Sequence, residues 1–350
     1  MSDKWMQQPI KLLDEQAAES ARLRQAQLTK PAGSLGRLEE LAIRLAAMQG
    51  TEQPQMRKAW VSVFAADHGL AQAGVSAFPA EVTAQMVHNF LNGGAAIAVL
   101  AKQQQIAFEV VDVGVNADFT PQPGLVIAKV AKGTASSLTG AAMTDSQCFA
   151  ALEVGKQAAD RAFQAGVDCF IGGEMGIGNT AAASLLIAKL TGLDLAPLVG
   201  AGTGLDAIGL AHKRQVLAQV MAQHQALDAR DPLAVLACLG GFEIAALAGA
   251  YLRCAQLGLP VLVDGVITTA AALVAEQLAP GAKHGWLFSH RSVEPAHQAC
   301  FDALQVQPLL QLDLRLGEGS GAAIAWPLLQ QACWLHNQMA TFAEAAVSSS

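Results

Sequence analysis

The sequence predicts an α/β protein built on a doubly wound, mainly parallel sheet with helices on both faces. Hydrophobic residues make up 52% of the 350 residues and charged residues only 15%, which suits a sheet that is buried on both sides. Along the chain, apolar runs of strand length lead repeatedly into a glycine turn and then an alanine-rich helical pattern. That order is typical of parallel sheets with crossover helices. The chain shows no fixed repeat period, which argues against a repeat array.

Charge and cysteine content narrow the possible function classes. A formal charge of −7 argues against a nucleic-acid-binding protein, because binding to phosphate backbones needs clustered Lys and Arg. The six cysteines are scattered without metal-type spacing, so we expect no metal site and interpret them as buried thiols. The first residues lack the apolar core of a signal peptide, and no apolar run reaches the ~20 residues of a membrane span. We therefore expect a cytoplasmic protein without membrane contact.

The apolar pattern predicts an order of elements along the whole chain. In the first half we expect helices over residues 1–50 with a break at 30–37, strands at 60–66 and 106–115, helical residues at 79–103 between them, a long loop at 118–144 and a helix at about 145–165. In the second half we expect a strand at 167–171, a further strand within 284–297, and strand, turn and helix in each of 195–215, 235–258 and 260–278.

The segment 313–325 organises the functional interpretation. An apolar run ends there in Gly317-Glu318-Gly319-Ser320-Gly321, and a helical pattern follows, so we expect a strand, a glycine turn and a helix. In open α/β sheets, ligands bind beyond the carboxyl ends of the strands. Glu318, flanked by residues without a Cβ, is therefore a candidate general base. The alternative is that Glu318 only caps the first N–H groups of the helix, and its position alone does not decide between the two.

Two more glycine-rich stretches predict an anion site. Residues 172–180, GGEMGIGNT, follow a strand, and residues 200–204, GAGTG, open a helix that carries Lys213. Backbone N–H groups in such turns form a nest in which phosphate is the natural guest. Neither stretch has the spacing of a Walker loop or a dinucleotide fingerprint. The alternative is that the glycines only permit close packing of helix on strand. Glu174 would repel a phosphate, so we expect it to face the sugar or the reacting base.

The joint order of seven motifs resembles one enzyme family, nicotinate-nucleotide:dimethylbenzimidazole phosphoribosyltransferase, which acts in assembling the lower ligand of cobalamin. The resemblance covers residues 30–330 and rests on KPAGSLGRLEE, FAADHG, VTAQMVHNFLNGGAAI, GEMGIGNTAAA, GAGTGLD, SHRSVEPAH and LRLGEGSGAA. The chain departs from the family pattern in GTASSLTGAAM, residues 133–143.

The resemblance implies a reaction without metal or cofactor. In this family, phosphoribose passes from nicotinate mononucleotide to 5,6-dimethylbenzimidazole. The leaving group is already a cationic pyridinium, so no general acid is needed. The incoming ring attacks through one nitrogen while its other nitrogen must lose a proton. By resemblance Glu318 accepts that proton, and Glu174 is a second acidic group nearby.

The resemblance also implies binding residues and an assembly. The predicted phosphate-binding residues are Gly176, Ile177, Gly178, Asn179, Thr180, Gly202, Thr203, Gly204, Lys213 and Ser292. The predicted base-binding residues are Gln85, Met86 and Leu316, with Gln85 as the hydrogen-bonding member. Members of the family are homodimers with a large α/β domain, here 55–320, and a small helical domain made from the chain ends, here 1–54 and 321–350.

Two alternative functions stay open at this level. One is an enzyme of the same fold that transfers phosphoribose to another base or hydrolyses the nucleotide. The other is a nucleotide sensor without chemistry, which would keep the glycine turns and tolerate the loss of Glu318.

Overall fold

One parallel sheet forms the centre of the molecule, whose computed structural model describes residues 3–202 and 204–348. Its seven described strands follow the order β3-β2-β1-β4-β5-β6-β7, and every pairing is parallel. The strands are β1 (Ala59–Ala66), β2 (Ala107–Gly114), β3 (Leu125–Ile127), β4 (Cys169–Met175), β5 (Val261–Val263), β6 (Trp286–His290) and β7 (Pro308–Leu310). The order reverses between β1 and β4, so the predicted doubly wound sheet is confirmed, and its carboxyl edge there is a topological switch point.

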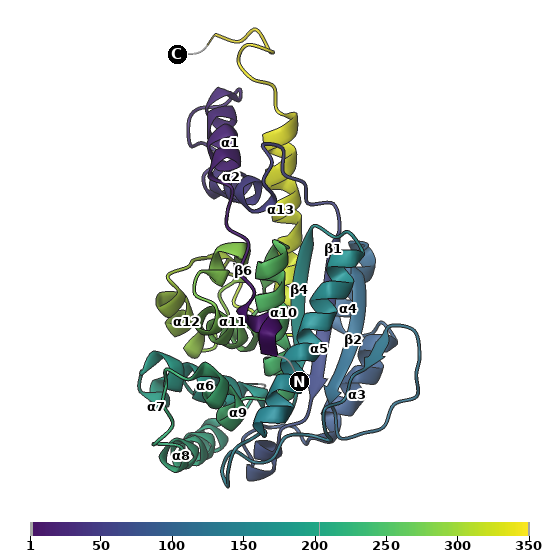
Figure 1. Cartoon of the computed structure of the whole chain (residues 1–350), viewed down its shortest axis with the longest axis vertical. Helices are drawn as coiled ribbons and strands as arrows, with labels where there is room; N and C mark the ends of the chain where they lie inside the picture. Colours follow the sequence, from purple (N-terminus) through teal and green to yellow (C-terminus); the bar gives the residue numbers. More distant parts are fainter. Residues whose placement is uncertain (1–2, 203, 349–350) are drawn as a thin grey trace.

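Helices cover both faces of the sheet (Figure 1). On one face lie α3 (Glu81–Leu91), α4 (Ala96–Gln103) and α13 (Ser320–Gln338), with α2 (Arg37–Gln49) packed on α13. On the other lie α5 (Asp145–Gln164), α10 (Phe242–Leu257) and α11 (Val266–Leu278), with α6 (Asn179–Thr191), α7 (Leu195–Leu198), α8 (Ala207–Gln223), α9 (Pro232–Leu239) and α12 (Ala296–Leu304) beyond them. The described residues also form three short 3-10 helices: η1 (Asp3–Gln7), η2 (Gly69–Ala73) and η3 (Ala282–Gly285).

Alternation along β1 explains why this strand is apolar apart from Ser62. Val61 and Val63 belong to the core cluster under α13, whereas Phe64 and Ala66 belong to the cluster under α10. Because successive side chains of a strand point to opposite faces, a strand buried on both sides is mainly apolar, and the buried Ser62 hydroxyl donates to Glu109 at 2.7 Å.

Three strand predictions are wrong. Residues 195–199 and 235–239 contain α7 and α9 instead of strands, and residues 311–316, before the Glu318 turn, have no regular structure. Short apolar runs do not distinguish a strand from a buried helix. At α9 the deciding signal is Pro232 at the first turn, with the Asp231 carboxylate accepting the Ala234 N–H at 3.0 Å.

Two further boundaries differ from the expectation. The short strand β3 lies inside the segment expected to be a long loop, and it extends the sheet beyond β2. Strand β4 continues through Gly172, Gly173 and Glu174 to Met175, so its glycine turn starts later than predicted.

Helices from the two terminal parts of the chain lie together at one end of the molecule, where α1 (Glu15–Gln27) packs on α2 and α2 packs on α13 (Figure 1). Arg24 Nε donates to the His336 carbonyl at 2.8 Å. The segment before α1 packs elsewhere, on the helices that cover the sheet. There the Lys11 N–H donates to the Ala255 carbonyl of α10 at 2.9 Å. Helix α13 begins at Ser320, next to the expected boundary between residues 320 and 321. The division into two domains stays a prediction.

The cysteines are free thiols, and five of the six are buried. Among the described residues no helix is long and apolar enough to cross a membrane.

Candidate active site

A cavity of about 400 Å³ opens at the carboxyl edge of the sheet. It lies beside the ends of β4, β5 and β6 and is closed by α3 and by the segment before α13. Its lining residues are Phe78, Val82, Met86, Glu174, Met175, Gly176, Ile177, Asn179, Thr180, Gly202, Gly265, Val266, Ile267, His290, Ser292, Glu294, Arg315, Leu316, Gly317 and Glu318. Its size and mixed polar and apolar lining suit a small organic ligand.

Glu318 lines this cavity in a strained backbone conformation. Its φ is +66°, between Gly317 at +87° and Gly319 at +89°. A left-handed conformation is uncommon for a residue with a Cβ and costs about 1–3 kcal/mol, so the surrounding structure must hold it. Within the described chain, Oε2 of Glu318 is buried without a hydrogen-bond partner. A buried acceptor without a partner is costly for stability, which favours a role toward a ligand.

Glycines around Glu318 allow the turn to approach its neighbours. A Cβ on Gly317 would lie 2.3 Å from Oε1 of Glu174, and one on Gly321 would lie 2.2 Å from the His290 ring. From the other side, a Cβ on Gly173 of β4 would lie 2.2 Å from the Glu318 carbonyl oxygen. The glycine pattern is therefore required by contact between this turn and the ends of β4 and β6.

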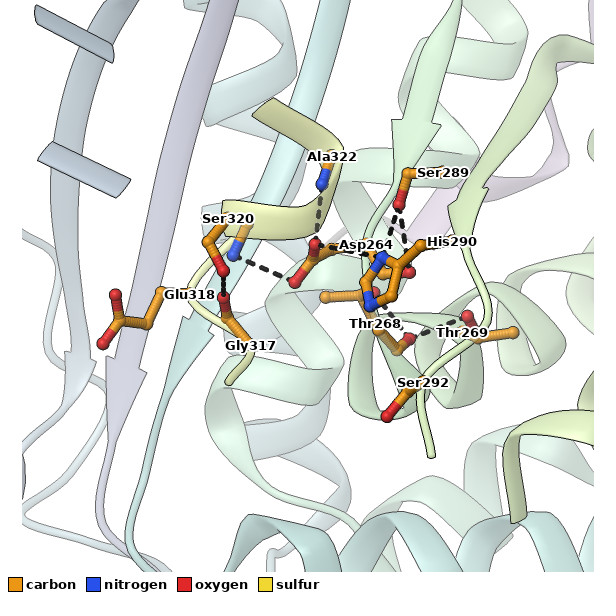
Figure 2. A network of polar contacts seen from close by, with 12 residues as sticks. Asp264, Thr268, Thr269, Ser289, His290, Ser292, Gly317, Glu318, Ser320 and Ala322 are labelled. Atoms are coloured by element: carbon orange, nitrogen blue, oxygen red, sulfur yellow. Dashed lines mark hydrogen bonds and ion pairs between the residues drawn. The ribbon is translucent and has the colours of Figure 1, made fainter. Parts of the chain in front are cut away.

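The helix cap of α13 comes from a residue other than Glu318. The N–H groups of Gly319 and Ala322 donate to the carboxylate of Asp264, at 3.1 Å and 2.8 Å. Figure 2 shows the Glu318 side chain directed away from Asp264 and the network around it. The interpretation of Glu318 as a helix cap is therefore wrong.

Glu174 lies next to the Glu318 turn, with different surroundings. Asn179 Nδ2 donates to its Oε2 at 2.5 Å, and its Oε1 lies 3.4 Å from the Glu318 backbone nitrogen. Burial, and then the charge of Asp264, raise the pKa of Glu174 well above its usual value. Burial also raises the pKa of Glu318, to about 7, while the Ile97 N–H acts in the opposite direction. The cavity therefore holds two acids whose pKa values are both raised, each in different surroundings.

The two glycine turns meet at Lys213. Its Nζ donates to Thr180 Oγ1 at 2.9 Å and to the Gly200 carbonyl at 3.1 Å. Burial lowers the pKa of Lys213 to about 8. In the first turn, Gly178 has a φ of +99° and α6 begins at once, but the Ile177 N–H already donates to Thr83 at 3.1 Å. These contacts join both turns into one polar wall of the cavity.

Comparison with known proteins decides the family. A phosphoribosyltransferase family model matches residues 10–347. The chain belongs to this phosphoribosyltransferase family. Two curated relatives, from Pseudomonas putida (strain W619) and Ectopseudomonas mendocina (strain ymp), are each 53% identical over 99% of both chains. Both are named nicotinate-nucleotide--dimethylbenzimidazole phosphoribosyltransferase. A crystal structure of the enzyme of that name from Thermus thermophilus matches with a TM-score of 0.91 at 46% identity, covering 97% of this chain and 100% of the other.

The phosphoribosyltransferase fold gathers most of the residues predicted for the site. The predicted residues that line the cavity are Glu318, Glu174, Gly176, Ile177, Asn179, Thr180, Gly202, Ser292, Met86 and Leu316. Gly178 and Lys213 do not line it but position residues that do. Gly204 lines an adjoining cavity of about 360 Å³. Gln85 is exposed on α3 and lines neither cavity, and Thr203 lies outside the described residues. The roles of all these residues stay predictions.

Several lining residues were missing from the predicted set. His290 and Arg315 stand beside predicted residues, in SHRS and RLGEG, so proximity to a motif was the available signal. Phe78, Val82 and Val266 contribute apolar surface. Only the folded structure distinguishes such side chains from ordinary core residues.

Adding a methyl group at Gly173 tests the close packing of the Glu318 turn. We expect Gly173→Ala to lower the free energy of unfolding by roughly 1–3 kcal/mol, because the new Cβ must displace a backbone carbonyl. Gly140→Ala is the matched control, since a Cβ there meets nothing within 4 Å. Urea unfolding of both variants measures the effect, and equal stability of the two would contradict the packing argument.

The raised pKa of Glu318 predicts a stability effect that depends on pH. Glu318 has a pKa of about 7 in the folded state against 4.5 in a model peptide, so the folded state retains a proton that the unfolded state releases between those values. Stability is therefore lost as pH rises from about 4.5 to 7. We expect Glu318→Gln to be more stable than the wild type at pH 8, by roughly 1–3 kcal/mol, with a smaller gain at pH 5. Thermal and urea unfolding, with exposed Glu15→Gln as control, measure this difference.

Proposed function

We propose that this enzyme transfers the phosphoribosyl group of nicotinate mononucleotide to 5,6-dimethylbenzimidazole, giving α-ribazole 5′-phosphate and nicotinate. The full-length relatives named for that reaction support the substrates. The observation that carries the chemistry is Glu318, a buried carboxylate with a pKa of about 7 that lines the cavity without a partner at Oε2.

Glu318 acts as the general base in this proposal. One benzimidazole nitrogen attacks the anomeric carbon of the ribose, and the bond from that carbon to the pyridinium nitrogen breaks, so nicotinate leaves with the bonding electrons. The N–H proton on the other benzimidazole nitrogen moves to Glu318. A base with a pKa near the working pH is well suited to this transfer, which is worth roughly 10²–10⁴ in rate. Alignment of the two rings across the ribose supplies the remainder.

Glu174 is the neighbouring acid that stays protonated. Burial and the charge of Asp264 raise its pKa well above the usual value, and Asn179 holds one of its oxygens. A neutral Glu174 adds no second negative charge beside the base. Glu318 is therefore the carboxylate available to accept a proton, and Glu174 orients the groups around it.

We place the phosphate and the base of the substrates on different sides of the cavity. We place the phosphate against Gly176–Thr180 and Gly202, with Lys213 fixing Thr180 and Ser292 at the edge of the site. The flat base occupies the apolar side, which consists of Phe78, Val82, Met86 and Leu316.

The assembly and compartment complete the proposal. Leu316 is 58% exposed and Phe78 48% exposed in the single chain, so apolar surface surrounds the mouth of the cavity. We infer a homodimer, as is known for the family. Six free cysteines fit a reducing cytoplasm. Light scattering of the purified protein measures the mass of the assembly.

Incubation with nicotinate mononucleotide and a panel of bases tests the reaction. We expect the wild type to form α-ribazole 5′-phosphate with 5,6-dimethylbenzimidazole, detected by chromatography and mass spectrometry. A different preferred base would support the same fold acting on another acceptor, and free ribose 5-phosphate would indicate hydrolysis. Binding of the nucleotide without product would favour a sensor.

Loss of the carboxylate tests the role of Glu318. We expect Glu318→Gln to lower kcat by roughly 10²–10⁴-fold, whereas Glu15→Gln retains wild-type kcat. In the wild type, kcat/KM should rise with pH up to an apparent pKa of about 7, because only ionised Glu318 accepts the proton. Wild-type turnover in Glu318→Gln would assign the base to another group.

A further inference from the structure

Asp264 is a buried carboxylate that lies close to the candidate active site without lining its cavity. It follows β5 directly and is 1% exposed. Oδ2 accepts the N–H of Gly319 at 3.1 Å, and Oδ1 accepts the N–H of Ala322 at 2.8 Å (Figure 2). Both donors belong to the start of α13, where N–H groups lack partners within the helix and a negative charge is favourable.

The position of Asp264 matters because of the residue that precedes Gly319. Gly319 and Asp264 are 55 positions apart in the chain, and the peptide unit that Asp264 holds is the one immediately after Glu318. Glu318 has a positive φ between two glycines that also have positive φ. Such a turn has many alternative conformations, so its geometry persists only where outside contacts determine it.

We propose that Asp264 is a positioning residue for this reaction, which fixes the Gly317–Gly319 turn so that the Glu318 carboxylate faces the cavity. The proposal rests on the proposed function of Glu318 as general base. Asp264 itself contacts neither substrate, and it acts through Glu318.

The charged groups around Asp264 define what its substitution changes. His290 Nδ1 lies 3.9 Å from Oδ1, and Glu174 is the acid on the adjacent strand. Burial raises the pKa of Asp264, while His290 and the backbone N–H groups act in the opposite direction. The charge of Asp264 is in turn one cause of the raised pKa of Glu318, after burial. An asparagine here would keep the shape, lose one of the two N–H acceptors and remove that charge.

Asp264→Asn separates a positioning role from a purely structural one. We expect kcat to fall about 10²-fold, the effect of misplacing a reacting group by about 1 Å, with little change in KM for nicotinate mononucleotide. The acid limb of kcat/KM should move to lower pH. In the Glu318→Gln background, Asp264→Asn should have little further effect on kcat, because coupled residues are not additive. The matched control is Asp231→Asn, at the helix cap of α9, which should retain the wild-type values.

Each outcome bears on the proposal. Two results would overturn the proposal while leaving the proposed function intact. One is a folded Asp264→Asn variant with wild-type kcat and pH profile. The other is that Asp264→Asn lowers kcat by the same factor in the wild type and in the Glu318→Gln background. Absence of turnover in the wild type would instead reject the proposed function. If thermal unfolding shows that Asp264→Asn does not fold, Asp264→Ser, which is smaller and keeps one oxygen acceptor, is measured in the same way. A crystal structure of the folded variant should show Glu318 displaced from its left-handed conformation.

Discussion

Close contact between the Glu318 turn and β4 is the constraint on which the site depends. The Glu318 carbonyl lies so near Gly173 that a Cβ on that glycine would come within 2.2 Å of it. Glycine inside a strand weakens the strand and often marks a place where another backbone approaches. The protein accepts that cost in the middle of its sheet because the contact brings the start of α13 to the carboxyl end of β4.

Acidic side chains accumulate at this edge of the sheet, and their hydrogen-bond partners differ. Asp264 binds backbone N–H groups, and Glu174 binds Asn179. Behind Gly176, burial works against a charge on His68, but Glu243 at 2.5 Å outweighs it and raises the pKa of His68. Glu318 and Glu243 each have a buried oxygen without a partner in the described chain, but Glu318 lines the cavity and Glu243 does not. Local contacts thus give neighbouring carboxylates different electrostatic surroundings.

Local sequence patterns predicted the glycine turns of the site, but not every strand or the contacts between distant parts of the chain. Glycines beside Glu318 and in residues 176–180 mark real turns, because a positive φ and close approach are local demands. The strands expected at 195–199 and 235–239 were helices, since short apolar runs carry no periodicity that separates the two. The bond from Asp264 to Gly319 spans 55 positions and has no local signature. Gln85 shows the same limit, because its exposure depends on how α3 packs.

The open apolar end of the cavity gives a physical reason for a flat, aromatic acceptor. A carboxylate with a raised pKa needs a site from which water is excluded, and a glycosidic bond held next to water would be lost to hydrolysis. In the single chain the side chains of Phe78 and Leu316 are about half exposed, so the protein alone does not complete that exclusion. A ring stacked against them would cover both side chains and, in the same position, bring an N–H toward Glu318. The acceptor would thus supply both the proton for the base and the surface that keeps water away from it.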